Sequence, residues 1–174
     1  MQTDLSDGVG YLAREGIVDP KRVCIVGASY GGYAALAGVT LQHGIYRCSV
    51  SVAGISDLHR MRNETRRDDT SDVTRFWDRY WGVSNKDESK ALKEISPIEH
   101  VQSVDVPVLL IHGKDDTVVP YAQSEIMQSA LKKAGKQVEL VTLKREDHWL
   151  SRSETRLQML EATVAFLREH NPPN

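Results

Sequence analysis

The chain has 174 residues, 40% apolar and 26% charged, a composition typical of one soluble globular domain. A net charge of −2 and a pI near 6.3 give no basis for a nucleic-acid partner or an acidic membrane surface. No stretch approaches the roughly 18 apolar residues of a membrane span, and the first residues lack signal-peptide features, so we expect no membrane partner and a cytoplasmic location, although a longer parent protein could be periplasmic or secreted.

The first part of the chain alternates between helical and strand patterns. Apolar residues at helical spacing predict a helix over residues 3–16. An apolar, β-branched run predicts a buried strand at about residues 22–26, followed by a glycine-rich turn at 27–32 and an alanine-rich helix to about His43. A second strand is predicted over residues 48–53.

The two cysteines, Cys24 and Cys48, each fall inside one of these predicted strands. Neither has C-x-x-C or metal-ligand spacing, and two cysteines are too few for a disulfide framework. We therefore expect both to be small buried hydrophobic residues, and we expect no metal or organic cofactor.

The second half of the chain begins with a different pattern. Residues 55–95 are rich in charge and aromatics and show no strand signal, which predicts helices and loops inserted between two strands. Strands at residues 108–112 and 138–143 then alternate with helices at about 122–134 and 153–170. Alternating strands and helices indicate βαβ units and a mostly parallel sheet of about four strands flanked by helices.

These elements predict one α/β domain over residues 1–174, with residues 55–95 as a helical and loop insertion within it. The basic residues Arg60, Arg62, Arg66 and Arg67 of that insertion alternate with acidic ones. We interpret them as a solvated face.

A candidate nucleophile lies between the first strand and the following helix. The pentapeptide from Gly27 to Gly31 has the form G-x-S-x-G, in the strand, turn and helix context of a nucleophile elbow. We expect side chains at Gly27 and Gly31 to collide with neighbouring backbone, which explains the glycines. Ser29 would then project from the carboxyl end of the sheet, and the N–H of Tyr30 would face an oxyanion.

A candidate acid and base follow the two later strands. Asp116 comes after the third predicted strand and His148 after the fourth, both at carboxyl strand ends. His148 would take the proton of Ser29 as it attacks a carbonyl, and Asp116 would hold the imidazole and stabilise the imidazolium. Asp57, after the second strand, stays open as an alternative acid. We interpret Asp115 as a turn residue, and His112, at a strand end, as a structural histidine.

Four motifs resemble the C-terminal catalytic part of the prolyl oligopeptidase family (S9) of serine peptidases. They are the elbow Gly27 to Tyr33, the acidic-R-Y-x-G tag Asp78 to Gly82, the L-x-H-G-x-x-D-x-x-V-P pattern Leu110 to Pro120, and the pair Asp147-His148. The resemblance covers nearly the whole chain and implies part of an α/β-hydrolase fold.

The resemblance implies a role for five residues. Ser29, Asp116 and His148 would form the catalytic triad. Tyr30 would supply one oxyanion N–H and part of the pocket for the residue before the cleaved bond, and Phe76 would also line that pocket.

The family pattern also contains parts that this sequence does not show. Members have further strands before the elbow, a second oxyanion donor there, commonly a tyrosine hydroxyl, and usually a β-propeller. Without those strands the elbow strand would lie at a sheet edge, so we expect a homodimer or larger assembly that pairs this edge. Loss of one oxyanion donor costs roughly a hundred- to a thousandfold in rate, so activity could be weak.

The sequence thus predicts a serine hydrolase that cleaves amide bonds of small peptides through an acyl-enzyme on Ser29. A carboxylesterase acting on small esters is the nearest alternative, because the same triad accepts esters. An inactive structural or interaction module that keeps the triad is an alternative of another class.

Overall fold

The computed structural model describes residues 2–65, 78–82 and 89–173, and its centre is a four-stranded sheet. The strands lie in the order β1-β2-β3-β4, and all three neighbouring pairs are parallel. The strands are β1 Cys24–Ala28, β2 Cys48–Val52, β3 Val108–Gly113 and β4 Val138–Leu143. The parallel α/β architecture predicted from the sequence is therefore confirmed.

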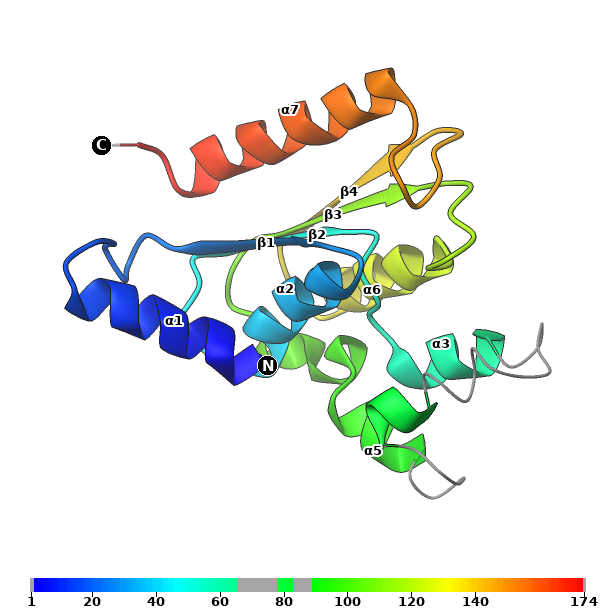
Figure 1. The fold of residues 1–174 in the computed structure, drawn as a ribbon, viewed down its shortest axis with the longest axis horizontal. Helices are drawn as coiled ribbons and strands as arrows, with labels where there is room; N and C mark the ends of the chain where they lie inside the picture. Colours follow the sequence, from blue (N-terminus) through cyan, green and yellow to red (C-terminus); the bar gives the residue numbers. More distant parts are fainter. Residues whose placement is uncertain (1, 66–77, 83–88, 174) are drawn as a thin grey trace.

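Helices cover both faces of the sheet (Figure 1). The helix α7 lies on one face, whereas α2 and α6 lie on the other, with α1 beside α2. None of the described helices is long and apolar enough to cross a membrane. The described helices with assigned bounds are α1 Gln2–Arg14, α2 Tyr30–Thr40, α3 Leu58–Thr65, α5 Ser89–Glu94, the 3-10 helix η1 Pro97–Ser103, α6 Ala122–Lys133 and α7 Ser153–His170.

The first strand lies two residues later than its sequence pattern predicted. It continues through Gly27 and Ala28, which pair with Ser51 and Val52 of β2. The strand therefore runs directly into Ser29, so no separate turn precedes the nucleophile candidate.

Two apolar layers hold the helices on the sheet. Every residue of β2 and β3 is buried, as expected for parallel strands covered on both faces. One layer packs under α2 and α6 and includes Leu36, Val108, Leu110, Met127 and Leu131. The other packs under α7 and includes Val50, Leu109, Ile111, Leu143 and Phe166.

The described part of the segment between β2 and η1 contains the helices α3 and α5 and no strand. It packs through its own cluster, which includes Ile55, Leu58, Met61, Leu92 and Val119. The interpretation of its arginines as a solvated face is wrong for Arg62. That side chain is buried and donates from Nε and Nη2 to the two carboxylate oxygens of Asp78, at 2.5 and 2.9 Å.

Cys24 and Cys48 form a disulfide between β1 and β2, which corrects the expectation of two free buried thiols. The two residues are direct register partners in the parallel ladder, with Cα atoms 4.7 Å apart. This separation is within the range that a disulfide spans. The count of two cysteines excluded a framework but did not exclude a single bond, and only the strand register shows that they meet.

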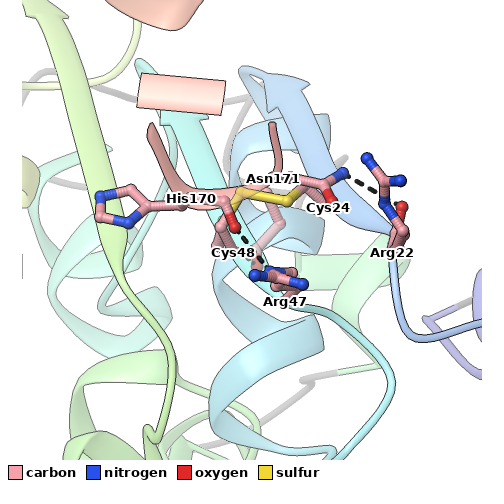
Figure 2. The surroundings of a disulfide bond; sticks show 8 residues. Arg22, Cys24, Arg47, Cys48, His170 and Asn171 are labelled. Atoms are coloured by element: carbon pink, nitrogen blue, oxygen red, sulfur yellow. Dashed lines mark hydrogen bonds between the residues drawn. A yellow bond between two sulfur atoms is a disulfide. The ribbon is translucent and has the colours of Figure 1, made fainter. Parts of the chain in front are cut away.

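Three hydrogen bonds hold the end of α7 and the residues after it beside this disulfide (Figure 2). Arg47 Nε donates to the carbonyl of His170 at 2.6 Å, and the Arg22 guanidinium donates to the carbonyl of Pro172. Asn171 Nδ2 donates in return to the Arg22 carbonyl at 3.1 Å. The end of α7 is thus tied to the amino-terminal ends of β1 and β2.

Two of the three glycines of the elbow allow its backbone to pack closely. A Cβ on Gly27 would lie 2.1 Å from the carbonyl oxygen of Gly31, so the predicted collision at Gly27 is present. The predicted collision at Gly31 is wrong, because a Cβ there would meet nothing within 4 Å outside its own helix. The second crowded position is Gly32, where a Cβ would lie 2.7 Å from the Cα of Gly54, after β2.

We predict opposite effects of alanine at Gly31 and Gly32. Both residues lie in α2, where alanine is intrinsically favoured over glycine by roughly 1 kcal/mol. Gly31→Ala should therefore keep or slightly raise the free energy of unfolding. Gly32→Ala should lower it by about 1 to 3 kcal/mol, because backbone atoms must shift. Urea denaturation of both variants checks this, and equal effects would contradict the packing described.

Candidate active site

Ser29 lies between the end of β1 and the start of α2, in a backbone conformation that residues other than glycine rarely adopt. Its φ is 55° and its ψ is −118°. The conformation is held from both sides, since Ser29 N donates to the Val52 carbonyl at 2.8 Å and Tyr33 N donates to the Ser29 carbonyl at 3.1 Å. Such strain places a serine hydroxyl at the carboxyl rim of the sheet.

Tyr30 is the first residue of α2, so its N–H has no partner four residues earlier within the helix. Its ring lies 5.7 Å from the ring of Tyr33 and 6.3 Å, edge-on, from the ring of Tyr80. Burial, with the neighbouring Tyr80, raises the pKa of Tyr30, and burial beside Tyr30 raises the pKa of Tyr33 to about 12. The phenols of Tyr30 and Tyr33 therefore stay neutral near pH 7. Together with Tyr80, their rings form an aromatic wall at the start of α2.

Asp116, in the loop after β3, presents a buried carboxylate that accepts three hydrogen bonds and lies close to a fourth N–H group. Oδ1 accepts the backbone N–H groups of Val118 and Val119, both at 2.8 Å. Oδ2 accepts His148 Nδ1 at 2.7 Å and lies 3.2 Å from His112 Nε2. Burial alone would raise the pKa of Asp116, but hydrogen bonds from the two histidines and the two backbone groups outweigh it and lower that pKa.

His148, in the loop after β4, connects the carboxylate to the serine. While its Nδ1 donates to Asp116, its Nε2 lies 2.9 Å from Ser29 Oγ. The structure therefore places Ser29, His148 and Asp116 in one succession of hydrogen bonds, with a base in reach of a hydroxyl and an acid in reach of the base.

The loops that carry the acid and the base contact each other through their backbones. Asp115 N donates to the Glu146 carbonyl at 3.0 Å, and Lys114 N donates to the Leu143 carbonyl at 2.9 Å. A Cβ on Gly113 would lie 2.5 Å from that same Glu146 carbonyl oxygen. Glycine at this position lets the two loops approach, which fixes the separation of Asp116 and His148.

The remaining candidates have other places. Asp57, the alternative acid, accepts the N–H of Arg60 at 2.8 Å and so caps the start of α3. Asp115 is exposed in the turn, and Phe76 lies outside the described residues. Among the residues that the structure describes, no three His, Cys, Asp or Glu side chains are grouped to hold a metal ion.

Sequence reasoning missed the buried Glu146 and the contact of His112 with Asp116. Glu146 is fully buried, accepts the N–H of Asp147 at 3.0 Å and the hydroxyl of Thr155, and so joins the His148 loop to the first turn of α7. His112 was expected to be structural, but it also contacts Asp116. An acidic residue shortly before a helix was the available signal for Glu146, whereas nothing in the sequence pattern paired His112 with Asp116.

A sequence model of the prolyl oligopeptidase family matches residues 1–172. Dipeptidyl aminopeptidase BIII of Pseudoxanthomonas mexicana is 28% identical over 177 residues, which covers 97% of this chain and 24% of that protein. The chain thus spans about a quarter of the length of this relative.

Solved structures agree with this match. A puromycin-hydrolysing peptidase of Mycobacterium tuberculosis superposes with a TM-score of 0.83 at 31% identity, covering 96% of this chain and 24% of that one. Pyrococcus horikoshii acylaminoacyl peptidase superposes with a TM-score of 0.84 at 25% identity, covering 99% and 28%. The sheet and its helices are therefore those of an α/β-hydrolase peptidase domain.

The lowered pKa of Asp116 predicts how stability changes in acid. An unfolded aspartate titrates near pH 3.9, so a lower folded pKa adds stability above that pH, which is lost as the pH falls toward the folded value. Between about pH 5 and pH 2, the free energy of unfolding should fall less steeply in Asp116→Asn than in the wild type.

The adjacent Asp115→Asn is the matched control, because it also removes one carboxyl but from an exposed turn position. Chemical denaturation at a series of pH values gives the three slopes. If Asp116→Asn and Asp115→Asn flatten the slope equally, the hydrogen bonds to Asp116 do not lower its pKa as described.

Proposed function

The chain belongs to the prolyl oligopeptidase family, and we propose that it carries the nucleophile, base and acid of a serine peptidase that cleaves amide bonds of small peptides. The observation that carries this proposal is the succession Ser29 Oγ, His148 Nε2, His148 Nδ1 and Asp116 Oδ2, with distances of 2.9 and 2.7 Å across its two gaps. Each group is in reach of the next without rearrangement.

In the first half of the reaction, Ser29 Oγ attacks the scissile carbonyl carbon while its proton passes to His148 Nε2. The imidazolium is stabilised by Asp116, which keeps the second ring proton on Nδ1. Collapse of the tetrahedral intermediate breaks the C–N bond, and the proton on Nε2 moves to the leaving amine. The products are an acyl-enzyme on Ser29 and a free amine.

In the second half, His148 takes a proton from water, and the resulting hydroxide attacks the acyl carbon. Ser29 Oγ leaves and recovers its proton from Nε2, which releases a carboxylic acid. In both halves the N–H of Tyr30, at the start of α2, would donate to the oxyanion, assisted by the positive end of the helix.

The aromatic wall of Tyr30, Tyr33 and Tyr80 favours a substrate with an apolar or ring-shaped residue before the cleaved bond. Tyr30 and Tyr80 have exposed fractions of 36% and 54%, so their rings can contact a ligand. The names of the relatives, a dipeptidyl aminopeptidase, an acylaminoacyl peptidase and a puromycin-hydrolysing peptidase, agree with small amide substrates. Phe76 stays part of this proposal as a further lining residue.

We predict that a fluorophosphonate probe labels the protein on Ser29 and that Ser29→Ala abolishes the labelling. Removal of the nucleophile should also lower kcat by at least about a thousandfold on any substrate that is turned over. Ser49→Ala is the matched control, because it removes a buried hydroxyl that donates to Ala35 in the fold and lies outside the triad. Mass spectrometry of the adduct identifies the labelled residue.

A pair of substrates separates the alternatives. Turnover of aminoacyl or prolyl anilides supports the peptidase, whereas turnover of p-nitrophenyl esters without anilides would make the protein a carboxylesterase. Failure of the folded wild type to react with the probe would leave the inactive structural module as the correct interpretation.

The open edge of β1 supports a further part of the proposal, a homodimer or larger assembly. Within the described part of the chain, β1 pairs only with β2, and Val26 in its centre is 50% exposed. Unpaired edge strands that expose apolar side chains associate with other chains. A second copy pairing at β1 would extend the sheet and cover Val26.

We predict that this 174-residue chain is dimeric or larger in light scattering at micromolar concentration. Val26→Lys should shift it toward monomer, because a lysine on an edge strand opposes pairing. Leu160→Lys on α7 is the control, since it places the same charge on an exposed apolar residue away from the edge. A monodisperse wild-type monomer would contradict the proposal.

A further inference from the structure

A second histidine shares the carboxylate of the proposed triad. We propose that His112 is a positioning residue that acts through Asp116, holding Oδ2 of that carboxylate in line with Nδ1 of His148. This role rests on the proposed function, because it is a role in hydrolysis. The contacts of His112 with Asp116, Val119 and Ser124 carry the proposal.

His112 lies near the end of β3 and is fully buried, yet each ring nitrogen has a polar neighbour. Nε2 is 2.9 Å from the carbonyl oxygen of Val119 and 3.2 Å from Asp116 Oδ2. Nδ1 is 2.7 Å from Ser124 Oγ, in the first turn of α6. The imidazole therefore connects three elements: the strand, the loop of the acid and the following helix.

These partners decide where the proton of a neutral imidazole lies. The Val119 carbonyl and the Asp116 carboxylate can only accept, so Nε2 must carry the hydrogen. Nδ1 then has a lone pair, to which the Ser124 hydroxyl donates. One N–H and one lone pair satisfy all three contacts, and Nε2–H is shared between the loop backbone and the carboxylate.

The same loop is held from its other side. The Val119 carbonyl accepts the N–H of His112, and the Val119 N–H donates to Asp116 Oδ1. The other oxygen, Oδ2, faces Nε2 of His112 and accepts Nδ1–H of His148. Rotation of the carboxylate would break contacts on both oxygens. His112 thus removes the freedom that Asp116 would need to turn away from His148.

His112 also withdraws charge from the oxygen that faces the base. A carboxylate that gives part of its charge to one N–H stabilises a neighbouring imidazolium less. Removing the donor should therefore move the acidic limb of the pH profile of kcat/KM to higher pH. The other charged groups around the two loops, Asp147, Glu146 and Lys114, are unchanged by variants at His112.

The first experiment measures kcat, KM and the pH profile of kcat/KM for His112→Leu and His112→Gln. In His112→Leu the acidic limb should move up by about half to one pH unit, and kcat should fall more than KM changes. His112→Gln keeps an amide N–H near the position of Nε2 and should restore part of both. Rates are divided by the concentration of fluorophosphonate-titrated sites, which removes the contribution of misfolded protein.

Ser124→Ala provides a milder variant in case His112→Leu does not fold. It leaves the imidazole in place but removes the donor to Nδ1, so kcat should fall several-fold with a smaller shift of the acidic limb. Ser49→Ala loses an equally buried hydroxyl remote from Asp116 and should leave the limb in place. If the limb of His112→Leu, or of Ser124→Ala where His112→Leu does not fold, coincides with that of Ser49→Ala, the proposal is overturned.

A measurement independent of turnover separates this inference from the proposed function. Nitrogen-15 NMR of the wild type reports which ring nitrogen of His112 carries the proton, whether or not the protein hydrolyses any substrate. The proposal requires the proton on Nε2, and a proton on Nδ1 alone would overturn it. If His112 carries Nε2–H but the probe does not label the protein, the proposed hydrolase function is refuted, whereas the contact of His112 with Asp116 is retained.

Discussion

The site depends on the parallel direction of the four strands. Parallel strands bring their carboxyl ends to one rim, so the residues that follow β1, β3 and β4 meet there although up to 119 residues separate them. Two of those loops are then fixed by backbone contacts between Gly113, Asp115 and Glu146. A distance of 2.9 Å between His148 and Ser29 is thus a property of the sheet and not of flexible side chains.

Electrostatic balance at Asp116 is the second requirement of the site. A buried carboxylate is costly unless it is hydrogen-bonded, and here four N–H groups surround it. Two come from its own turn and two from imidazoles on different elements. The lowered pKa of Asp116 keeps the carboxylate ionised in the fold, so it can stabilise the positive charge that His148 gains when it takes a proton from Ser29.

Much of the fold and of the candidate site could be predicted from the sequence, because local residue patterns encode them. Strand and helix periodicity predicted the alternation of elements. The glycine-rich turn, the chain order and the family motifs pointed to Ser29, Asp116 and His148, with Asp57 left as an alternative acid. Contacts that depend on register were not readable: the pairing of Cys24 with Cys48, the approach of Gly32 to Gly54, and the burial of Arg62 against Asp78. Each joins residues whose own neighbours give no signal of the partner.

The close backbone approach of the two rim loops restricts how the domain can vary. A residue inserted after Gly113 or before Asp147 would separate the acid from the base, and any side chain at Gly113 would push against the Glu146 carbonyl. Transplanting one loop from a relative would therefore fail unless the other came with it. For protein engineers, the strand ends of β3 and β4 form a single exchangeable unit.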